Sequence, residues 1–461
     1  MNSKIISGMI FIMIFNSIVS CSGNRAVTGK LIKTSESSIE PFTKVTLDNG
    51  LDVIVKEVHT APIVAVYLWC KTGSTNENER EQGISHFYEH MFFKGTEKRG
   101  VGEIDRIIKS LGGYNNAFTS KEYTAYYVVL PSENFSLAAD VLVDAIRNSS
   151  FPDQEIEKER GVIKEEINRK EDNPTGKLYE EIFRIAFPDT PYELPVLGTK
   201  KSVSEFTRDD FKNYLAKHYV PDNMAAVIVG DVKTKDAIEE IKRLTADWKN
   251  DAEVPRSTGK ITVSRREGIK GFELEKDVNM SYALMAFQTS GYADLKENAV
   301  LDVASSILSE GRSSRLYRRL VEEEQLVTSV QAFIYPLKHS GLFAIYSTMD
   351  RGSVQDFKKA ILEEIEKLRN VPVEQAELQK VKTMLKADFQ FSCETNSDIG
   401  YTLGHYSTLG MLDNVTQYEK SIDEVTADDV AMYARKVLIP ESYSIGIINQ
   451  RVQEDVEVSG E

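Results

Sequence analysis

Apolar residues along the chain follow two periods, and each period predicts a different kind of element. Strand-like runs rich in Val, Ile and aromatic residues occupy 51–58 (LDVIVKEV) and 63–70 (IVAVYLWC). Apolar positions three and four residues apart predict amphipathic helices, as do many acidic and basic residues between them. These helices are expected near 100–112, 136–149 and 154–171, and again near 296–310, 354–370 and 374–391. The mixture predicts an α+β protein.

A polar stretch near residue 250 divides this pattern into two parts. The segment KNDAEVPRSTGK (249–260) contains Pro255 and Gly259 and lacks either period, so it predicts a linker. We place the linker at 251–261, between a first domain of residues 42–250 and a second of residues 262–461. Each domain has the usual size of an independently folding unit. Clear repetition between the two halves is not visible residue by residue.

The first 20 residues form an apolar run that ends at a cysteine. The run is interrupted by Asn16 and falls short of the roughly 20 unbroken apolar residues that span a bilayer, so residues 1–20 predict a secretory signal peptide. Its end, IVSC, resembles the bacterial lipobox, in which the cysteine is acylated and becomes the new N-terminus. We therefore expect Cys21 to be lipidated. The alternative is ordinary cleavage near Ser20, which leaves Cys21 as a free thiol.

A lipidated Cys21 has consequences for location. Several acyl chains give a stable membrane anchor, which one chain alone does not. The polar residues 21–41 then predict a flexible tether, and the chain is expected at the bacterial cell envelope, facing the periplasm. Ser22 after the cysteine argues mildly against retention at the inner membrane, so the outer membrane is the expected site and the inner membrane is the alternative.

Composition excludes some functions and favours others. The chain has 71 Asp and Glu against 56 Lys and Arg, a formal charge of −15, so no domain-wide basic surface for nucleic acid is expected. Unfolded or basic peptides suit this charge better than acidic ones. Apart from Cys21, only Cys70 and Cys393 remain after removal of the signal, too few for a disulfide framework, and we expect both to be buried thiols.

The segment GISHFYEHMFFKGT (83–96) combines a core-facing helix with a cluster of ligands. Its apolar residues form one stripe at helical spacing: Ile84, Phe87, Tyr88, Met91 and Phe92. The opposite face holds His86, Glu89 and His90 within one narrow sector. Two neutral imidazoles at positions i and i+4 can bind one Zn²⁺, and a catalytic zinc needs a third protein ligand. A solvated polar face with two unremarkable histidines is the alternative, and it is disfavoured because this His-x-x-Glu-His motif is rare by chance.

The third ligand is expected on another helix. In QEIEKERGVIKEEINRK (154–170), Glu159 and Glu166 share a stripe with Ile156, Ile163 and Ile167. A buried carboxylate is costly unless it is paired or binds a metal, and a zinc ion would supply that partner. The alternative is that both glutamates only border a solvated surface.

Together these motifs resemble the pitrilysin-like inverzincin metallopeptidases, and most closely their processing-peptidase branch. The resemblance extends over nearly the whole chain after the signal, through LDNGLDVIV (47–55), GISHFYEHMFFKGT, GGYNNAFTSKEYTAYY (112–127), ERGVIKEEI (159–167), PYELPVLGT (191–199), NMAAVIVGDV (223–232) and GRSSRLY (311–317). It implies two similar half-domains that enclose a central chamber, each a mostly antiparallel sheet with helices packed against it.

The resemblance also assigns roles to single residues. It implies one Zn²⁺ per chain held by His86, His90 and Glu166, with Glu159 as the acid that orients a ligand. Glu89 is implied as the catalytic base of peptide-bond hydrolysis. Peptide substrate is implied to add as a strand along an edge near Asn116, Ala117 and Phe118. Asn116 as a simple turn or strand-end residue is the alternative.

The second half departs from the family pattern. Members that act alone carry an Arg and, seven residues later, a Tyr just after the SSRLY segment, but Val321 and Thr328 stand at those positions here. Neither can hold substrate or a developing oxyanion. We therefore expect the zinc-carrying subunit of a heterodimer whose homologous partner supplies the Arg/Tyr pair. The alternatives are a self-sufficient homodimer and a non-catalytic scaffold subunit, and the intact ligand set disfavours the scaffold.

The lipid anchor leads to a direct prediction. Cys21→Ser should abolish incorporation of labelled fatty acid in a bacterial host, because the acylated thiol is gone, whereas Cys70→Ser should keep the wild-type label. Scintillation counting of the purified chains measures the difference. Equal labelling of Cys21→Ser and the wild type would refute the anchor.

Overall fold

The computed structural model describes residues 39, 41–250 and 261–451. The predicted signal peptide, Cys21, most of the tether and all but the last residue of the predicted linker therefore lie outside the described residues. Cys70 and Cys393 are both buried. Among the described residues, no helix has the length and apolar character needed to span a bilayer.

The first half contains a six-stranded sheet. Its strands are β1 (Thr43–Thr46), β2 (Asp52–Glu57), β3 (Ile63–Cys70), β4 (Tyr114–Thr119), β5 (Thr124–Pro131) and β6 (Met224–Gly230). They run in the order β1-β2-β6-β3-β5-β4, and every neighbouring pair is antiparallel except β2 and β6. The continuous apolar sequences of β3 and β6 follow from burial on both faces. Strand β4 forms one edge of the sheet.

The second half repeats this topology. Its sheet consists of β7 (Lys270–Lys276), β8 (Ser281–Thr289), β9 (Ser329–Pro336), β10 (Gly341–Met349) and β11 (Ser444–Gln450). The order β7-β11-β8-β10-β9, with only β7 and β11 parallel, matches the order β2-β6-β3-β5-β4 strand for strand. The predicted fold class is confirmed: the protein is α+β, with two similar half-domains. The two halves share a strand order although their amino-acid sequences show no clear repetition.

Helices follow or separate the strands in both halves. In the first half they are α1 (Ile84–Phe92), α2 (Glu103–Ser110), α3 (Phe135–Asn148), α4 (Asp153–Asp172), α5 (Pro174–Ala186), α6 (Lys200–Glu205), α7 (Arg208–His218) and α8 (Thr234–Leu244). In the second they are α9 (Leu295–Ser309), α10 (Val354–Asn370), α11 (Gln375–Phe391), α12 (Asn396–Thr408), α13 (Leu412–Glu424) and α14 (Ala427–Val437). The six helices predicted from apolar spacing are all present, with ends within a few residues of expectation.

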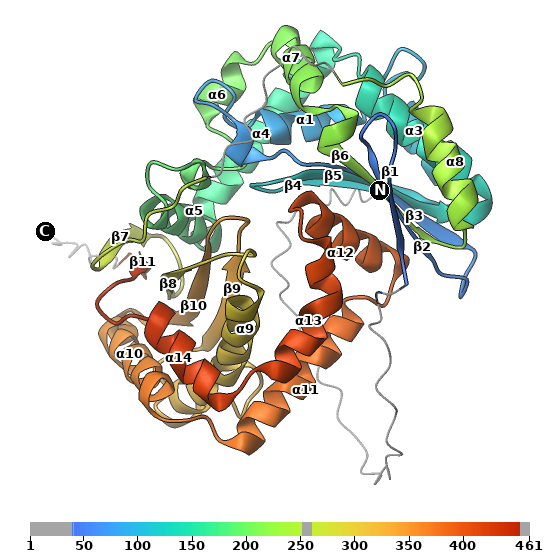
Figure 1. Ribbon diagram of the computed structural model, residues 1–461. Helices are drawn as coiled ribbons and strands as arrows, with labels where there is room; N and C mark the ends of the chain where they lie inside the picture. The colour runs from blue at the N-terminus through green and yellow to red at the C-terminus, as the bar shows by residue number, and fades with distance from the viewer. Residues whose placement is uncertain (1–38, 40, 251–260, 452–461) are drawn as a thin grey trace, which may run out of the picture.

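One helix from each half packs on the sheet of the other half (Figure 1). Helix α5 contributes Leu178, Ile182 and Phe183 to a core with Leu284 and Ile448 of the second sheet. Helix α12 contributes Ile399 and Leu403 to a core on the face of the first sheet that α1 leaves uncovered, and α13 adds Leu412 and Val415. Each sheet is thus covered on one face by its own helices and on the other by an exchanged helix.

Two glycines let α12 approach the first sheet closely. A Cβ atom at Gly400 would lie 2.7 Å from Cε2 of Tyr67, and one at Gly404 would overlap the indole of Trp69. Both aromatic residues are buried on β3. The contact fixes the exchanged helix through shape rather than through charge.

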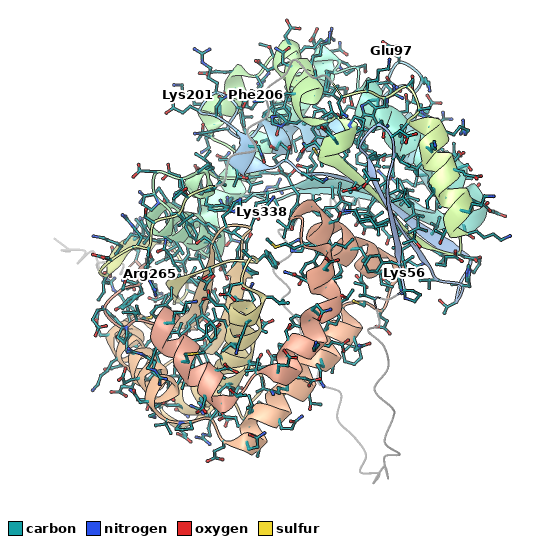
Figure 2. All side chains as sticks on the ribbon, in the orientation of Figure 1. Lys56, Glu97, Lys201, Phe206, Arg265 and Lys338 are labelled. Atoms are coloured by element: carbon teal, nitrogen blue, oxygen red, sulfur yellow. The ribbon has the colours of Figure 1, made fainter. Side chains whose placement is uncertain are left out.

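A partly buried carboxylate joins the two halves at the turn between β4 and β5. Both oxygens of Glu122 accept the backbone N–H of Lys338, at 2.9 and 3.0 Å, and Oε1 also accepts the hydroxyl of Tyr192 at 2.6 Å. Lys338 lies in the turn between β9 and β10, where the second half reaches the first (Figure 2). The β4–β5 hairpin is therefore held from both halves. Enclosure of a central chamber between the halves stays a prediction.

The helix exchange generates a stability prediction. Gly404→Ala should destabilise the protein by about 1 to 3 kcal/mol, because the added methyl group overfills the contact with Trp69. Gly161→Ala is the matched control in α4: it meets nothing within 4 Å, and it should stabilise by about 0.5 to 1 kcal/mol. Urea unfolding of both variants measures the difference. A Gly404→Ala variant as stable as Gly161→Ala would contradict the close approach of α12.

Candidate metal centre

Helix α1 presents two different faces, as its sequence predicts. Ile84, Phe87, Tyr88, Met91 and Phe92 are all buried in the core of the first half. The other face carries His86, Glu89 and His90, which are only partly buried. Gly83 begins the helix with a positive φ of 87°, a conformation that a residue with a side chain rarely adopts. The core packing therefore aims both imidazoles away from the sheet.

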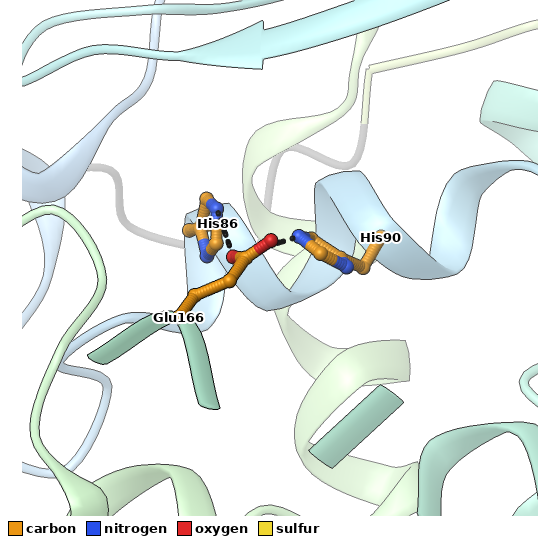
Figure 3. Close-up of side chains that lie close together, drawn as sticks. All are labelled: His86, His90 and Glu166. Carbon is orange, nitrogen blue, oxygen red and sulfur yellow. Dashed lines mark ion pairs between the residues drawn. The ribbon is translucent and has the colours of Figure 1, made fainter. Parts of the chain in front are cut away.

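Three potential ligand atoms converge between α1 and α4 (Figure 3). Oε2 of Glu166 lies 3.6 Å from Nε2 of His86 and 3.5 Å from Nε2 of His90. Ligands at about 2.0 to 2.1 Å around a tetrahedral zinc ion lie roughly 3.4 Å from one another. The donor set and its spacing fit Zn²⁺. Among the described residues, this is the one His, Cys, Asp and Glu group whose ligand atoms converge in this way.

Glu159 orients one of the two imidazoles. Its Oε2 lies 2.9 Å from Nδ1 of His90, and its Oε1 lies 2.7 Å from Nζ of Lys94. A proton on Nδ1 leaves Nε2 free to act as a ligand on the side of Glu166. Nδ1 of His86 is buried and has no hydrogen-bond partner among the described residues. The two histidines are therefore held in different ways.

The charges around the centre shift several pKa values. Burial opposes protonation of His90, but hydrogen bonds to Glu159 and Glu166 outweigh it and raise the pKa of His90 to about 10. Burial, with smaller contributions from His90 and Lys170, holds the pKa of His86 well below its ordinary value. A metal ion at this site would therefore compete with a proton on His90 more than with one on His86.

Glu89 lies between the two histidines in sequence and points to a different neighbour. Its Oε2 accepts the hydroxyl of Thr119, at the end of β4, at 2.6 Å. Burial raises its pKa, although the nearby His90 and the hydrogen bond from Thr119 oppose this. The hydrogen bond ties the helix of the metal centre to the edge strand.

The predicted substrate residues lie along that edge strand. Ala117 donates its N–H to Oδ1 of Asn116 at 2.9 Å, so this amide is not used in pairing with β5. Phe118 packs against Trp69 and Tyr401, with ring centroids 5.3 and 5.4 Å away. Asn116 is thus a strand residue and not a turn residue. A role of Asn116, Ala117 and Phe118 in binding peptide stays a prediction.

Sequence reasoning missed two residues of this site. Thr119 holds Glu89, and Lys94 holds Glu159. Lys94 stands in the motif KGT and Thr119 in the motif AFTS, but no period or spacing in the sequence marks either residue as a partner of a distant carboxylate. Both contacts join residues that are far apart in the chain, so only the fold reveals them.

Val321 and Thr328 stand at the positions of the Arg/Tyr pair, and both make structural contacts within the second half. Val321 packs against the second core, and the hydroxyl of Thr328 donates to the carbonyl oxygen of Thr348 at 3.0 Å. Arg315 forms a two-pronged ion pair with Glu377, at 3.0 and 2.6 Å. Gly311 and Ser314 are linked by a hydrogen bond of 2.7 Å in the preceding turn. These contacts all lie within the second half, so the segment contributes to the fold of that half.

Two family models match the chain in succession. Residues 52–200 match the model described as Insulinase (Peptidase family M16), and residues 205–385 match the model described as Peptidase M16 inactive domain. The first matched range contains the complete candidate centre: His86, Glu89, His90, Glu159 and Glu166.

Similar proteins are known from bacteria and from a plant. An uncharacterized zinc protease of Rickettsia bellii (strain RML369-C) is 30% identical over 399 residues, which cover 86% of this chain and 95% of that protein. A probable mitochondrial-processing peptidase subunit beta of Arabidopsis thaliana is 29% identical over 421 residues, covering 88% and 78%. The crystal structure of a protease from Helicobacter pylori matches with a TM-score of 0.84 and 27% identity, covering 89% of this chain and 99% of that one.

Proposed function

Because the chain belongs to peptidase family M16, the pitrilysin-like zinc metallopeptidases, and resembles its processing-peptidase branch, we propose that it is a zinc endopeptidase. It hydrolyses unfolded peptides or oligopeptides at the cell envelope, where lipidated Cys21 anchors it. The observation that carries this proposal is the convergence of His86, His90 and Glu166 within 4.8 Å of one another.

The proposed mechanism assigns one task to each side chain of the centre. His86, His90 and Glu166 hold a single zinc ion, and Glu159 fixes the ring of His90. When bound, zinc supplies Lewis acidity, which polarises the scissile carbonyl and makes a water molecule easier to deprotonate. Glu89 takes that proton on a carboxylate oxygen and passes it to the leaving amine.

Substrate binding is proposed at the open edge of β4. The sheet ends there, so an extended peptide can approach this edge and take the place of the Asn116 side chain as the partner of the Ala117 N–H. Pairing through the main chain gives affinity with little dependence on sequence. The hydrogen bond between Thr119 and Glu89 places this edge beside the proposed base. After loss of residues 1–20, 55 basic against 71 acidic residues leave a charge of −16, which favours basic or unfolded peptides.

A second subunit is proposed to complete the site. Charge that develops on the carbonyl oxygen needs positioned donors, and Val321 and Thr328 supply none. A homologous partner with an Arg/Tyr pair would provide them across the proposed chamber. A relative named as a processing-peptidase subunit supports this arrangement. A self-sufficient homodimer, in which another Tyr or Arg substitutes, is the alternative.

A non-catalytic scaffold subunit is the alternative from a different class of function. It is disfavoured because the three ligands converge, Glu159 contacts His90, and Glu89 lies on the same face of α1 as the two histidines. Scaffold relatives of this fold tend to lose such residues, because a subunit that does not catalyse hydrolysis has no need of the ligands and the base.

Two substitutions separate metal binding from catalysis. Glu89→Gln should keep one zinc ion per chain and lower the hydrolysis rate by about 100- to 10,000-fold, because only the base is lost. His86→Ala should lose zinc as well, because it removes a ligand. Glu165→Gln is the matched control: it lies exposed beside Glu166 in α4 and should change neither property. Metal analysis and a fluorogenic peptide assay measure both, and full activity of Glu89→Gln would exclude the mechanism.

The partner is tested by reconstitution. The purified chain alone should hydrolyse peptides about 100- to 1,000-fold more slowly than with its homologous partner, because positioned donors are missing. Replacing the Arg and Tyr of that partner should remove the gain while leaving the complex intact by gel filtration. Equal rates in all three assays would exclude the heterodimer without affecting the proposed zinc site.

A further inference from the structure

A single buried carboxylate caps the N-terminus of the metal-binding helix. Oε2 of Glu77 accepts the N–H of Gly83 at 2.7 Å, and its Oε1 accepts the N–H and the hydroxyl of Ser85 at 2.9 and 2.5 Å. The first N–H groups of a helix have no partner within the helix, and Gly83 has no side chain to supply one. Ser85 immediately precedes His86. Glu77 therefore holds the turn from which the first imidazole projects.

The carboxylate is fixed from two further directions. Tyr214 of α7 lies 2.6 Å, hydroxyl to hydroxyl, from Ser85, which completes a buried chain of hydrogen bonds to Glu77. On the other side, the 3₁₀ helix η1 (Ser74–Asn76) leads directly into Glu77. Both the N–H and the hydroxyl of Thr75 donate to the carbonyl oxygen of Lys121, in the turn after β4, at 2.8 and 2.7 Å. Glu77 thus connects the first turn of α1 with the β4–β5 hairpin.

Glu77 occupies this place at a cost to stability. Its side chain is only 6% exposed, and among the described residues no Lys or Arg forms an ion pair with it. Burial raises the pKa of Glu77 to about 7, although the hydrogen bonds from Ser85 and Gly83 oppose this. The compensating interactions are those three hydrogen bonds and the partial positive charge of the helix N-terminus, roughly half an elementary charge. Through these hydrogen bonds, Glu77 helps to fix the position of the first turn of α1.

The two histidines differ in their need for such support. Glu159 fixes the ring of His90 through Nδ1, but Nδ1 of His86 has no hydrogen-bond partner among the described residues. The place of the His86 ring consequently depends on the backbone of the first helical turn. That backbone is the part of α1 that Glu77 holds.

We propose that Glu77 is a positioning residue of the metal centre, which holds Gly83 and Ser85 so that Nε2 of His86 stays beside Glu166. The inference rests on the proposed function in one respect, the assignment of His86 and Glu166 as zinc ligands. Glu77 touches neither metal ligand nor substrate and acts only through α1. Glu77 supports His86 through the backbone of α1, whereas Glu159 contacts the ring of His90 directly.

The test is the zinc affinity of Glu77→Gln in the full chain. The amide has one acceptor oxygen in place of two and turns an NH₂ group toward backbone donors, so the first turn of α1 should shift. The zinc dissociation constant, measured by competition with a chelator, should rise about 10- to 100-fold, as for other residues that orient ligands. The visible absorption of the Co²⁺-substituted protein should also change, because it reports the geometry of the ligands. Ser85→Ala, which removes only one donor, should show a smaller change in the same direction.

Glu297→Gln is the matched control for a general loss of stability. Glu297 is a buried carboxylate of α9 that accepts a backbone N–H, from Ser290 at 2.6 Å, and it lies in the second half. This variant should unfold more easily than the wild type and yet keep wild-type zinc affinity and the wild-type Co²⁺ spectrum.

The outcomes separate the inference from the proposed function. Wild-type zinc affinity in Glu77→Gln, or an equal loss of affinity in Glu297→Gln, would overturn the role of Glu77. If Glu77→Gln does not fold, unchanged affinity and an unchanged Co²⁺ spectrum in Ser85→Ala would overturn it. A wild-type chain that binds no zinc would instead overturn the proposed function on which the inference rests.

Discussion

Glu166 of α4 lies between the two imidazoles of α1. This contact requires the first half to hold α1 and α4 in a precise position relative to each other. Oε2 of Glu166 is 3.6 and 3.5 Å from the two Nε2 atoms, so a shift of α1 against α4 by one ångström would spoil the spacing for a small ion. The apolar core beneath α1 fixes the distance of the helix from the sheet. Glu77 holds the first turn of α1, which carries His86, and Glu159 holds the ring of His90. Core packing places the ligand side chains approximately, and hydrogen bonds from buried carboxylates set their final positions.

The centre gathers charge in a part of the molecule where isolated charge is unfavourable. Glu159 is paired with His90 and Lys94, and Glu89 accepts a hydrogen bond from Thr119, so each of these acids has a partner within the protein. The carboxylates that raise the pKa of His90 would also attract a cation, whereas burial lowers the pKa of His86.

Local periodicity was enough to predict the two helices of the centre and the faces they bury. The stripe of Ile84, Phe87 and Met91 leaves the histidines on the opposite face, and that reasoning needs no distant contact. The family resemblance then supplied the choice of Glu166 over Glu159. Contacts of Thr119 and Lys94 were missed because they join segments far apart in sequence. The common topology of the two sheets was equally invisible at the residue level, since strand order depends on backbone pairing and tolerates different side chains.

The exchange of α5 and α12 makes the two halves interdependent. Leu178 and Ile182 find their apolar partners in the second sheet, and Ile399 and Leu403 find theirs in the first, so either half expressed alone would expose one sheet face and one helix stripe. The halves on either side of the predicted linker therefore depend on each other to bury these apolar side chains. If the chain were cleaved in the predicted linker, the exchanged helices would still hold the two halves together. In evolution, one half could be replaced only if its sheet still matched the helix that it receives from the other half.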